Sequence, residues 1–451
     1  MSKSVVQVIP SASRLIHSLR DIGYDFVHAV ADLVDNSIAA GASEVIIDMR
    51  FDGHNSWVRV ADNGKGMSGT EITEAMRFGT EREYEADELG KYGLGLKTAS
   101  LSQCSCLTVA SRVDTDSRRM EVRQWNLEHV ESSNRWEILN IPAEERPDVL
   151  TEPLRDHKGT VVLWESLDRI LGYRVPWGER ARSGFFRLAE QLDEHLGMVF
   201  HRFLSGEAKR KRKLSISING TKVMAWDPFA REEHHTVKYQ QSQFDVETDD
   251  GPGVVAYVAY ILPAQEKFSS LQAFNRFAGP AKWNYQQGFY IYRADRMIQS
   301  GGWSYMRTCD EHTKFARVAL DFLPDLDSAF ELNVAKARVS LPADLRNQLK
   351  PYVEEVIKRA RHTYGAGNRD AGRGPGESGQ PAPDPRDGDT SGGSGAGTVA
   401  DPPGSRGGPR NKHIGKAIEV AAAEAGEEAA LRRIRQTLKK EDPEVSNDIG
   451  W

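Results

Sequence analysis

The strongest constraint on the fold is a segment near the C-terminal end that has almost nothing to bury. Between Gly365 and Arg410 the chain consists mainly of Gly, Pro, Ser and Asp, and Val399 is its only large aliphatic residue. Such a segment cannot bury enough apolar surface to offset the entropy lost on folding. We therefore expect a disordered linker over 365–411, with folded domains before it and a short helical tail over 412–451 that docks a partner.

Composition excludes several classes of protein. The chain has 451 residues, of which 39% are hydrophobic and 27% charged, and this is typical of two or three folded domains. No stretch approaches the roughly 18 apolar residues of a membrane helix, and the N-terminus has no apolar signal core, so we expect a cytoplasmic protein without a membrane partner. Three cysteines cannot form a disulfide framework or a zinc site.

The net charge of the chain neither indicates nor excludes binding to nucleic acid. The formal net charge is -6, so any binding to DNA needs a local basic patch. One run could contact phosphates, and a solvated loop between strands is an equally supported interpretation. This run comprises Lys209, Arg210, Lys211, Arg212 and Lys213.

Hydrophobic periodicity predicts an α+β fold in two parts. Helical spacing from Ser11 to Ala40 predicts two helices broken near Gly23, and a helix over 186–203 closes a first domain that spans 1–204. A new set of strands from Leu214 is expected to open a second α/β domain over 205–364. Strands are further predicted at 45–49, 57–60, 107–113, 159–164, 254–261, 288–292 and 318–322, and a helix at 345–361.

Two glycine clusters carry the chemistry of a nucleotide site. Asp62 follows a predicted strand, and its carboxylate can accept a hydrogen bond from an exocyclic amine, which favours adenine over guanine. Gly64 and Gly66 remove side chains that would keep a base away from the backbone. The second cluster runs from Gly90 to Lys97. Its backbone N–H groups can face phosphates, and Lys97 adds positive charge. The predicted nucleotide contacts are Asn36, Asp62, Gly64, Gly66, Met67, Gly90, Tyr92, Gly93, Leu94, Gly95, Leu96, Lys97 and Thr160.

The second predicted helix adds an acid and an amide on one face. Asp32 and Asn36 are four residues apart, so their side chains project from the same side. Alone, such a pair is usually solvated helix surface. Placed ahead of both glycine clusters, it favours a site for ATP and Mg²⁺, in which Asn36 supplies a neutral oxygen ligand to the metal.

These residues resemble the GHKL ATPase superfamily (gyrase, heat-shock chaperone, histidine kinase and MutL), and within it the MutL and MORC branch, particularly bacterial MORC-like proteins. The resemblance covers roughly residues 10 to 350. It implies a Bergerat-type ATP-binding sandwich, a transducer domain of ribosomal-protein-like fold, and an ATP-induced homodimer that hydrolysis resets. It also implies that Asp32 is catalytic and that Lys336 reaches back to the γ-phosphate.

One residue departs from the family pattern. The family usually has glutamate at the position of Asp32, and aspartate is shorter by roughly 1.5 Å. A misplacement of about 1 Å can lower a rate on the order of a hundredfold. Asp35 is a competing base, about 60° from Asp32 and about 100° from Asn36 around the helix. We expect a slow Mg²⁺-dependent ATPase, and the alternative is a non-hydrolysing, ATP-gated scaffold for a partner effector.

The biological role is implied only by the resemblance. It suggests DNA restriction, repair or anti-phage defence, beside a partner protein such as a nuclease. A histidine kinase would need a helical hairpin with a phosphoacceptor histidine ahead of the ATP site, and only a short segment precedes the first predicted helix. A chaperone of the ninety-kilodalton type or a gyrase would need further C-terminal domains, whereas the chain after Tyr364 is mostly predicted linker.

Overall fold

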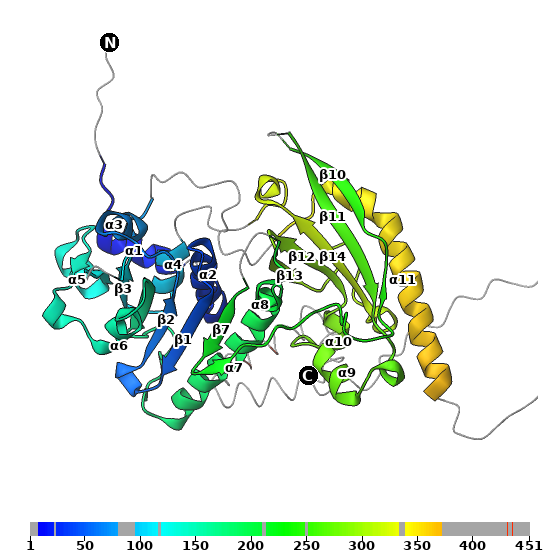
Figure 1. Cartoon of the computed structure of the whole chain (residues 1–451), viewed down its shortest axis with the longest axis horizontal. Helices are drawn as coiled ribbons and strands as arrows, with labels where there is room; N and C mark the ends of the chain where they lie inside the picture. The colour runs from blue at the N-terminus through cyan, green and yellow to red at the C-terminus, as the bar shows by residue number, and fades with distance from the viewer. Residues whose placement is uncertain are drawn as a thin grey trace, which may run out of the picture. The chain divides into compact units, whose positions relative to one another are not determined.

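The computed structural model describes residues 8–21, 24–79, 95–115, 119–209, 213–248, 251–332 and 339–371, together with Leu431 and Arg435. Two mixed sheets and their covering helices confirm the predicted α+β class (Figure 1). The described residues up to Ala371 belong to one compact unit, which spans 1–376. The boundary predicted between residues 204 and 205 stays a prediction. Among these described residues, no helix is long and apolar enough to cross a membrane.

The first sheet has eight strands in the order β5-β4-β3-β6-β2-β1-β7-β8. Alternating burial along β1, with Val45 and Ile47 inside, explains its place in the sheet, and its antiparallel pairing with β2 confirms the strands predicted at 45–49 and 57–60. The strands are β1 (Glu44–Arg50), β2 (Trp57–Asp62), β3 (Cys106–Arg112), β4 (Glu121–Asn126), β5 (Leu139–Asn140), β6 (Gly159–Glu165), β7 (Ser215–Ile218) and β8 (Thr221–Lys222).

The strand expected to open the second domain belongs instead to the first sheet. β7 pairs in parallel with β1, so the prediction that a new strand set starts at Leu214 is wrong. The physical reason is burial: Ile216 and Ile218 are buried in the same core as Val45 and Ile47. A short apolar strand carries no signal of which sheet edge it joins.

Two helices at the start of the chain position the candidate site. Ser11 caps α1 and Asp25 caps α2, each through a side-chain oxygen that accepts a backbone N–H three residues on. The two helices are separated as predicted, although Gly23 lies outside the described residues. The helices beside the first sheet are α1 (Ala12–Arg20), α2 (Phe26–Ala39), α3 (Gly69–Met76), α4 (Gly95–Leu101), α5 (Leu127–Ser133), α6 (Asp148–Thr151), α7 (Glu179–Val199) and α8 (His201–Ser205).

The second sheet follows the order β10-β11-β14-β12-β13, with β9 paired to β11. The long helix α11 lies along its face in Figure 1, where Leu349, Val353 and Val356 join the core of the sheet. The elements are β9 (Val237–Lys238), β10 (Ser242–Thr248), β11 (Gly251–Ile261), β12 (Gly288–Arg293), β13 (Arg296–Ser300), β14 (Ala316–Phe322), α9 (Leu271–Phe277), α10 (Lys282–Tyr285) and α11 (Ala343–Ala371). Short 3₁₀ helices lie at Gly53–Asn55, Ala143–Glu145, Glu152–Leu154, Gln265–Lys267, Glu311–Thr313 and Pro324–Leu326.

Helix α11 is longer than the sequence indicated. It continues to Ala371, so the first residues of the predicted linker 365–411 are helical. Once a helix has formed, each added residue gains one hydrogen bond at little further cost, and composition alone does not show this extension. The rest of the linker and nearly all of 412–451 lie outside the described residues, where only Leu431 and Arg435 are described, both helical.

Candidate functional site

The carboxylate of Asp62 lies at the end of β2 and is held by neighbouring donors. It accepts hydrogen bonds from the Gly64 N–H at 2.8 Å and from the Ser37 hydroxyl at 3.1 Å. Burial nevertheless raises the pKa of Asp62 to about 6, with the bonds from Gly64, Ser37 and the Thr160 backbone acting against that rise. Asp62 therefore has an oriented carboxylate that can take up a proton near neutral pH.

Three glycines let the backbone close around Asp62. A Cβ at Gly64 would lie 2.8 Å from Ala40 Cβ and 2.8 Å from Asp62 Oδ1. Gly66 has φ +73°, and its Cβ would lie 2.1 Å from the Arg112 carbonyl oxygen. At Gly159, φ is +144° and a Cβ would lie 1.9 Å from the Asp62 carbonyl oxygen. The first two positions agree with the residue types expected from the sequence, since a larger residue at either would disrupt this cradle.

Behind Asp62, two hydroxyls join β3 and β6. Thr160 on β6 is opposite Asp62 in the register, and its hydroxyl lies 3.0 Å from the Ser111 hydroxyl. Ser111 donates to the Gly159 carbonyl and accepts from the Met67 N–H at 2.8 Å. The structure thus brings Met67 and Thr160 to the cradle, and their contact with a nucleotide stays a prediction. Reasoning from the sequence missed Ser37 and Ser111, because nothing local distinguishes these serines from ordinary surface ones.

The acid of α2 is buried beside the first turn of α4. Asp32 is 2% exposed, whereas Asn36 one turn later is exposed. The Tyr24 hydroxyl donates to Asp32 Oδ2 at 3.1 Å, and burial beside this carboxylate raises the Tyr24 pKa far above its usual value. A Cβ at Gly95 would lie 3.4 Å from Asp32 Oδ2, so the start of α4 passes directly against this carboxylate. Reasoning from the sequence missed Tyr24.

The competing acid is engaged by an arginine from the second sheet. Asp35 is fully buried, and Arg296 Nε lies 2.9 Å from its Oδ1 and 2.8 Å from its Oδ2. Arg296 Nη2 also lies 3.9 Å from Asp32 Oδ1. A carboxylate that already accepts a charged bond in this way is poorly placed to take a proton from water. Asp35 is thus engaged more closely by Arg296 than Asp32 is, and the catalytic role of Asp32 stays a prediction.

The described residues of the second glycine cluster differ in exposure. Gly95 and Leu96 are half-buried in the first turn of α4. Lys97 is 1% exposed and its Nζ donates to the Ala75 carbonyl at 3.0 Å. Burial lowers the pKa of Lys97 to about 8, and the nearby Glu74 acts against this shift. The amine that was expected to face phosphates thus contacts the end of α3.

Several predicted contacts lie outside the described residues. These are Gly90, Tyr92, Gly93, Leu94 and Lys336, and also Arg210, Lys211 and Arg212 of the basic run. Within the part of the chain that the structure describes, no group of three or more His, Cys, Asp or Glu residues could hold a metal ion. Mg²⁺ in nucleotide sites usually uses one or two protein ligands together with substrate phosphates, so a single ligand from Asn36 is compatible with its exposed position.

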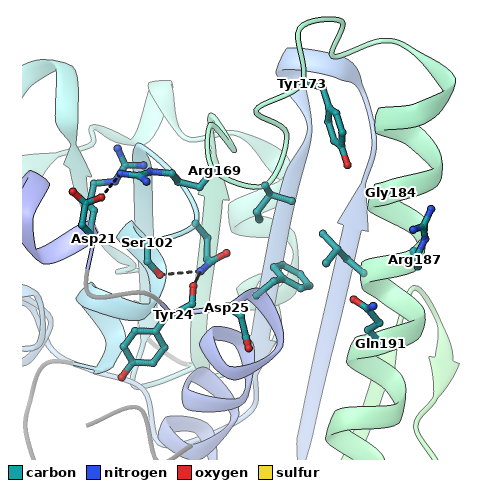
Figure 2. A pocket seen from close by; sticks show the side chains of 14 residues that line it. Asp21, Tyr24, Asp25, Ser102, Arg169, Tyr173, Gly184, Arg187 and Gln191 are labelled. Atoms are coloured by element: carbon teal, nitrogen blue, oxygen red, sulfur yellow. Dashed lines mark hydrogen bonds and ion pairs between the residues drawn. The ribbon is translucent and has the colours of Figure 1, made fainter. Parts of the chain in front are cut away.

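A separate pocket of about 570 Å³ lies beside Tyr24. Figure 2 shows Asp21 paired with Arg169 at one side of it, and Arg187 and Gln191 on α7 at the other. The residues that line this pocket include none of the predicted nucleotide contacts. This pocket is therefore distinct from the cradle around Asp62.

The chain is similar to known ATPases. Residues 24–160 match the family described as histidine kinase-, DNA gyrase B- and HSP90-like ATPase. The chain is 30% identical to the DNA mismatch repair protein MutL of Salmonella arizonae over 209 residues, which cover 45% of this chain and 29% of that protein. Against MutL of Pseudoalteromonas translucida it is 38% identical over 88 residues, covering 18% of this chain and 14% of that MutL.

The matches are partial. MutL of Pasteurella multocida is 35% identical over 98 residues, covering 21% of this chain and 16% of that protein. The chain thus spans less than a third of the length of the curated relatives it matches. Within the family match lie Asp32, Asp62 and Thr160, which the structure places on α2, β2 and β6. Residues 24–160 thus match the GHKL ATPase family, with all three of these residues inside the matched segment, and the relatives named above are MutL proteins.

Proposed function

We propose that this protein is an ATP-dependent conformational switch that binds ATP at the first sheet and hydrolyses it slowly. The observation that carries the proposal is the Asp62 carboxylate, held in a glycine cradle on the sheet against which α2, with its buried Asp32, packs. A carboxylate acceptor suits an exocyclic amine, and close backbone approach suits a flat base. Adenine fits both requirements.

Each residue has a distinct part in this proposal. Asp62 accepts from the adenine amine, so its proton must be absent when ATP binds. Asp32 orients the attacking water and takes its proton, while the Tyr24 hydroxyl holds the carboxylate in place. Asn36 would hold Mg²⁺ together with the phosphates, and the metal would neutralise phosphate charge. Thr160 supports the cradle from β6 through Ser111.

The wider cycle is part of the same proposal. ATP binding closes the lid segment that contains Gly90, Tyr92, Gly93 and Leu94, Lys336 contacts the γ-phosphate, and two copies of the chain dimerise. The named relatives are DNA mismatch repair proteins, which supports a DNA-related process. We further propose that the protein has a MORC-like defence role, that it binds DNA through residues 209–213, and that its partner is a nuclease.

A non-hydrolysing scaffold is the second candidate. It is favoured by the burial of Asp32, which is shorter than glutamate and already accepts from Tyr24. Water would have to reach this carboxylate after the nucleotide binds. The two candidates differ in one measurement, which is steady-state phosphate release with and without DNA.

The assignment is tested with three variants of similar size and chemistry. Asp62→Asn places an amide donor toward the adenine amine and leaves a buried polar group without a partner, so nucleotide binding should be lost in calorimetry. Asp32→Asn should bind ATP with the affinity of the parent and release no phosphate. Asp245→Asn, on the exposed face of β10, is the control and should match the parent in both assays. Normal affinity in Asp62→Asn, or normal turnover in Asp32→Asn, would contradict the corresponding role.

A further inference from the structure

Side chains at the turn between β12 and β13 join the second sheet to the first part of the chain. Arg202 of α8 pairs with Asp321 and, at 3.1 Å, with Asp295, and its guanidinium lies 3.6 Å from the centroid of the Tyr292 ring. His201 Nε2 lies 2.9 Å from the Tyr292 hydroxyl. These contacts involve α8 and do not include a residue of the nucleotide cradle.

A different contact reaches the helix that carries Asp32. Arg296, the first residue of β13, forms its ion pair with Asp35 of α2 across 261 positions of sequence. Both side chains are almost completely removed from solvent, at 2% and 0% exposure. An ion pair in such an environment is screened little by water, so its geometry is held strongly.

The same guanidinium lies near two carboxylates that are separated by less than one helical turn. Its Nη2 is 3.9 Å from Asp32 Oδ1, and its charge also lies over the Phe200 ring, 5.8 Å from the ring centroid. The contact with Phe200 limits how far the guanidinium can rotate. A shift of Arg296 would therefore change the electric field at Asp32 and the position of the Asp35 carboxylate at the same time.

Arg296 is fixed to the second sheet by a tight turn. Ala294 and Asp295 have φ values of +46° and +69°, and Arg293 pairs with Arg296 on either side of them. Two successive residues with positive φ are the pattern of a two-residue hairpin turn that matches the twist of its strands. The Ala294 N–H also donates to the carbonyl of Phe322 on β14. Movement of the sheet is thus carried directly to the Arg296 backbone.

We propose that Arg296 is a positioning residue that transmits the placement of the second sheet to the Asp32 helix, through its ion pair with Asp35. This inference rests on the proposed ATPase function and adds a coupling route to it. When the second sheet is seated, Arg296 holds α2 so that Asp32 faces the start of α4. When the sheet shifts, the pair loosens and Asp32 loses its catalytic position while the adenine cradle stays intact.

The test uses lysine substitutions, which keep the charge but lose the forked geometry of the guanidinium. Arg296→Lys is compared with Arg293→Lys, which alters an equally buried pair with Asp327 inside the second sheet. Arg202→Lys alters the contact with α8 and leaves α2 untouched. Arg296→Gln is a second variant at the same position, and Arg296→Lys retains the test if Arg296→Gln does not fold.

Three quantities are measured on the full chain. They are the affinity for a non-hydrolysable ATP analogue, kcat for ATP hydrolysis, and hydrogen exchange of α2 backbone amides without nucleotide. A misplacement near 1 Å costs on the order of a hundredfold in rate, so we expect kcat of Arg296→Lys to fall by about tenfold or more. Analogue affinity should stay within about threefold of the parent, since the cradle is intact. The α2 amides should exchange about tenfold faster in Arg296→Lys than in either control.

The outcomes separate this inference from the function it rests on. If Arg296→Lys keeps the kcat and the α2 exchange rates of the controls, Arg296 is a structural residue only and the inference is wrong. If all three lysine variants lose kcat equally, the coupling is not specific to α2 and the inference is also wrong. If the parent binds the analogue but releases no phosphate, the hydrolytic function and this inference fall together, whereas a hydrolysing parent with an unaffected Arg296→Lys overturns the inference alone.

Discussion

The protonation of Asp62 should control nucleotide affinity within an accessible pH range. Burial raises the pKa of this carboxyl from an ordinary 3.8 to about 6. Recognition of the adenine amine requires the deprotonated acceptor, so binding must release the proton at low pH. The dissociation constant for ATP should therefore be constant well above pH 6 and should rise by about tenfold for each pH unit below it.

The hydroxyl of Ser37 offers a way to move this transition. Its one proton lies within reach of two acceptors, Asp62 Oδ2 and the Leu33 carbonyl, both 3.1 Å from the oxygen, and when it is donated to Asp62 it stabilises the charged form. A hydrogen bond to a charged group contributes about 1.5 kcal/mol at the low end of measured values. Since one pKa unit corresponds to about 1.4 kcal/mol, Ser37→Ala should raise the pKa of Asp62 by about one unit, to near neutral pH.

The assay is calorimetric titration with ATP between pH 5 and pH 8 for the parent, Ser37→Ala and the exposed α7 variant Ser183→Ala. The terminal phosphate of ATP also titrates near pH 6 to 7, but it does so equally in all three proteins. The difference between Ser37→Ala and the two others therefore reports Asp62. If the loss of affinity begins at the same pH in Ser37→Ala as in the parent, the hydrogen bond does not tune the carboxylate and Asp62 is not the titrating acceptor.

Three further predictions concern the surroundings of the site. Gly66→Ala should lower the free energy of unfolding by more than Gly220→Ala in urea titrations. Both glycines have positive φ, which costs about 1 to 3 kcal/mol in strain, but only at Gly66 would a Cβ lie against a carbonyl. Equal losses in the two variants would contradict this close contact. Burial lowers the pKa of Lys97 to about 8, so between pH 8 and pH 10 the Lys97 amine is protonated more fully in the unfolded chain than in the folded one. The free energy of unfolding should therefore rise from pH 8 towards pH 10. Lys97→Met should abolish this rise, and a rise that persists in the variant would show that another group causes it. A chain cut after Ala371 should keep ATP affinity and lose only partner-dependent activity, and loss of folded protein would show that the tail is part of the fold.

Local patterns predicted much of the first half of the chain. The helical spacing of apolar residues in α1 and α2 and the strands at 45–49 and 57–60 depend on interactions between near neighbours. The glycines at 64 and 66 were also predictable, because their spacing after a strand indicates close backbone approach. Their partners were not, since the Arg112 carbonyl and the Ala40 side chain come from other elements.

Pairings between distant segments account for the errors and omissions. β7 has apolar residues at alternate positions, as a strand of either sheet would have, and only the open edge of β1 determines where it pairs. Tyr24, Ser37 and Ser111 are ordinary residue types at unremarked positions, and their roles appear only when α2, β2 and β3 are assembled. Composition similarly placed the start of the linker too early, because α11 continues to Ala371.

The choice between Asp32 and Asp35 shows where helix geometry stops being sufficient. Around an isolated helix the two carboxylates point about 60° apart, and either could face a nucleotide. The tertiary structure separates them by their partners: Arg296 engages Asp35 through the guanidinium, whereas Asp32 accepts from the neutral hydroxyl of Tyr24 and lies against Gly95. The Tyr24 hydroxyl orients the Asp32 carboxylate, and Arg296 Nη2 lies 3.9 Å from Asp32 Oδ1, so the guanidinium is farther from Asp32 than from Asp35. The charge that holds Asp35 comes from the second sheet, and a base beside it is therefore subject to whatever moves that sheet.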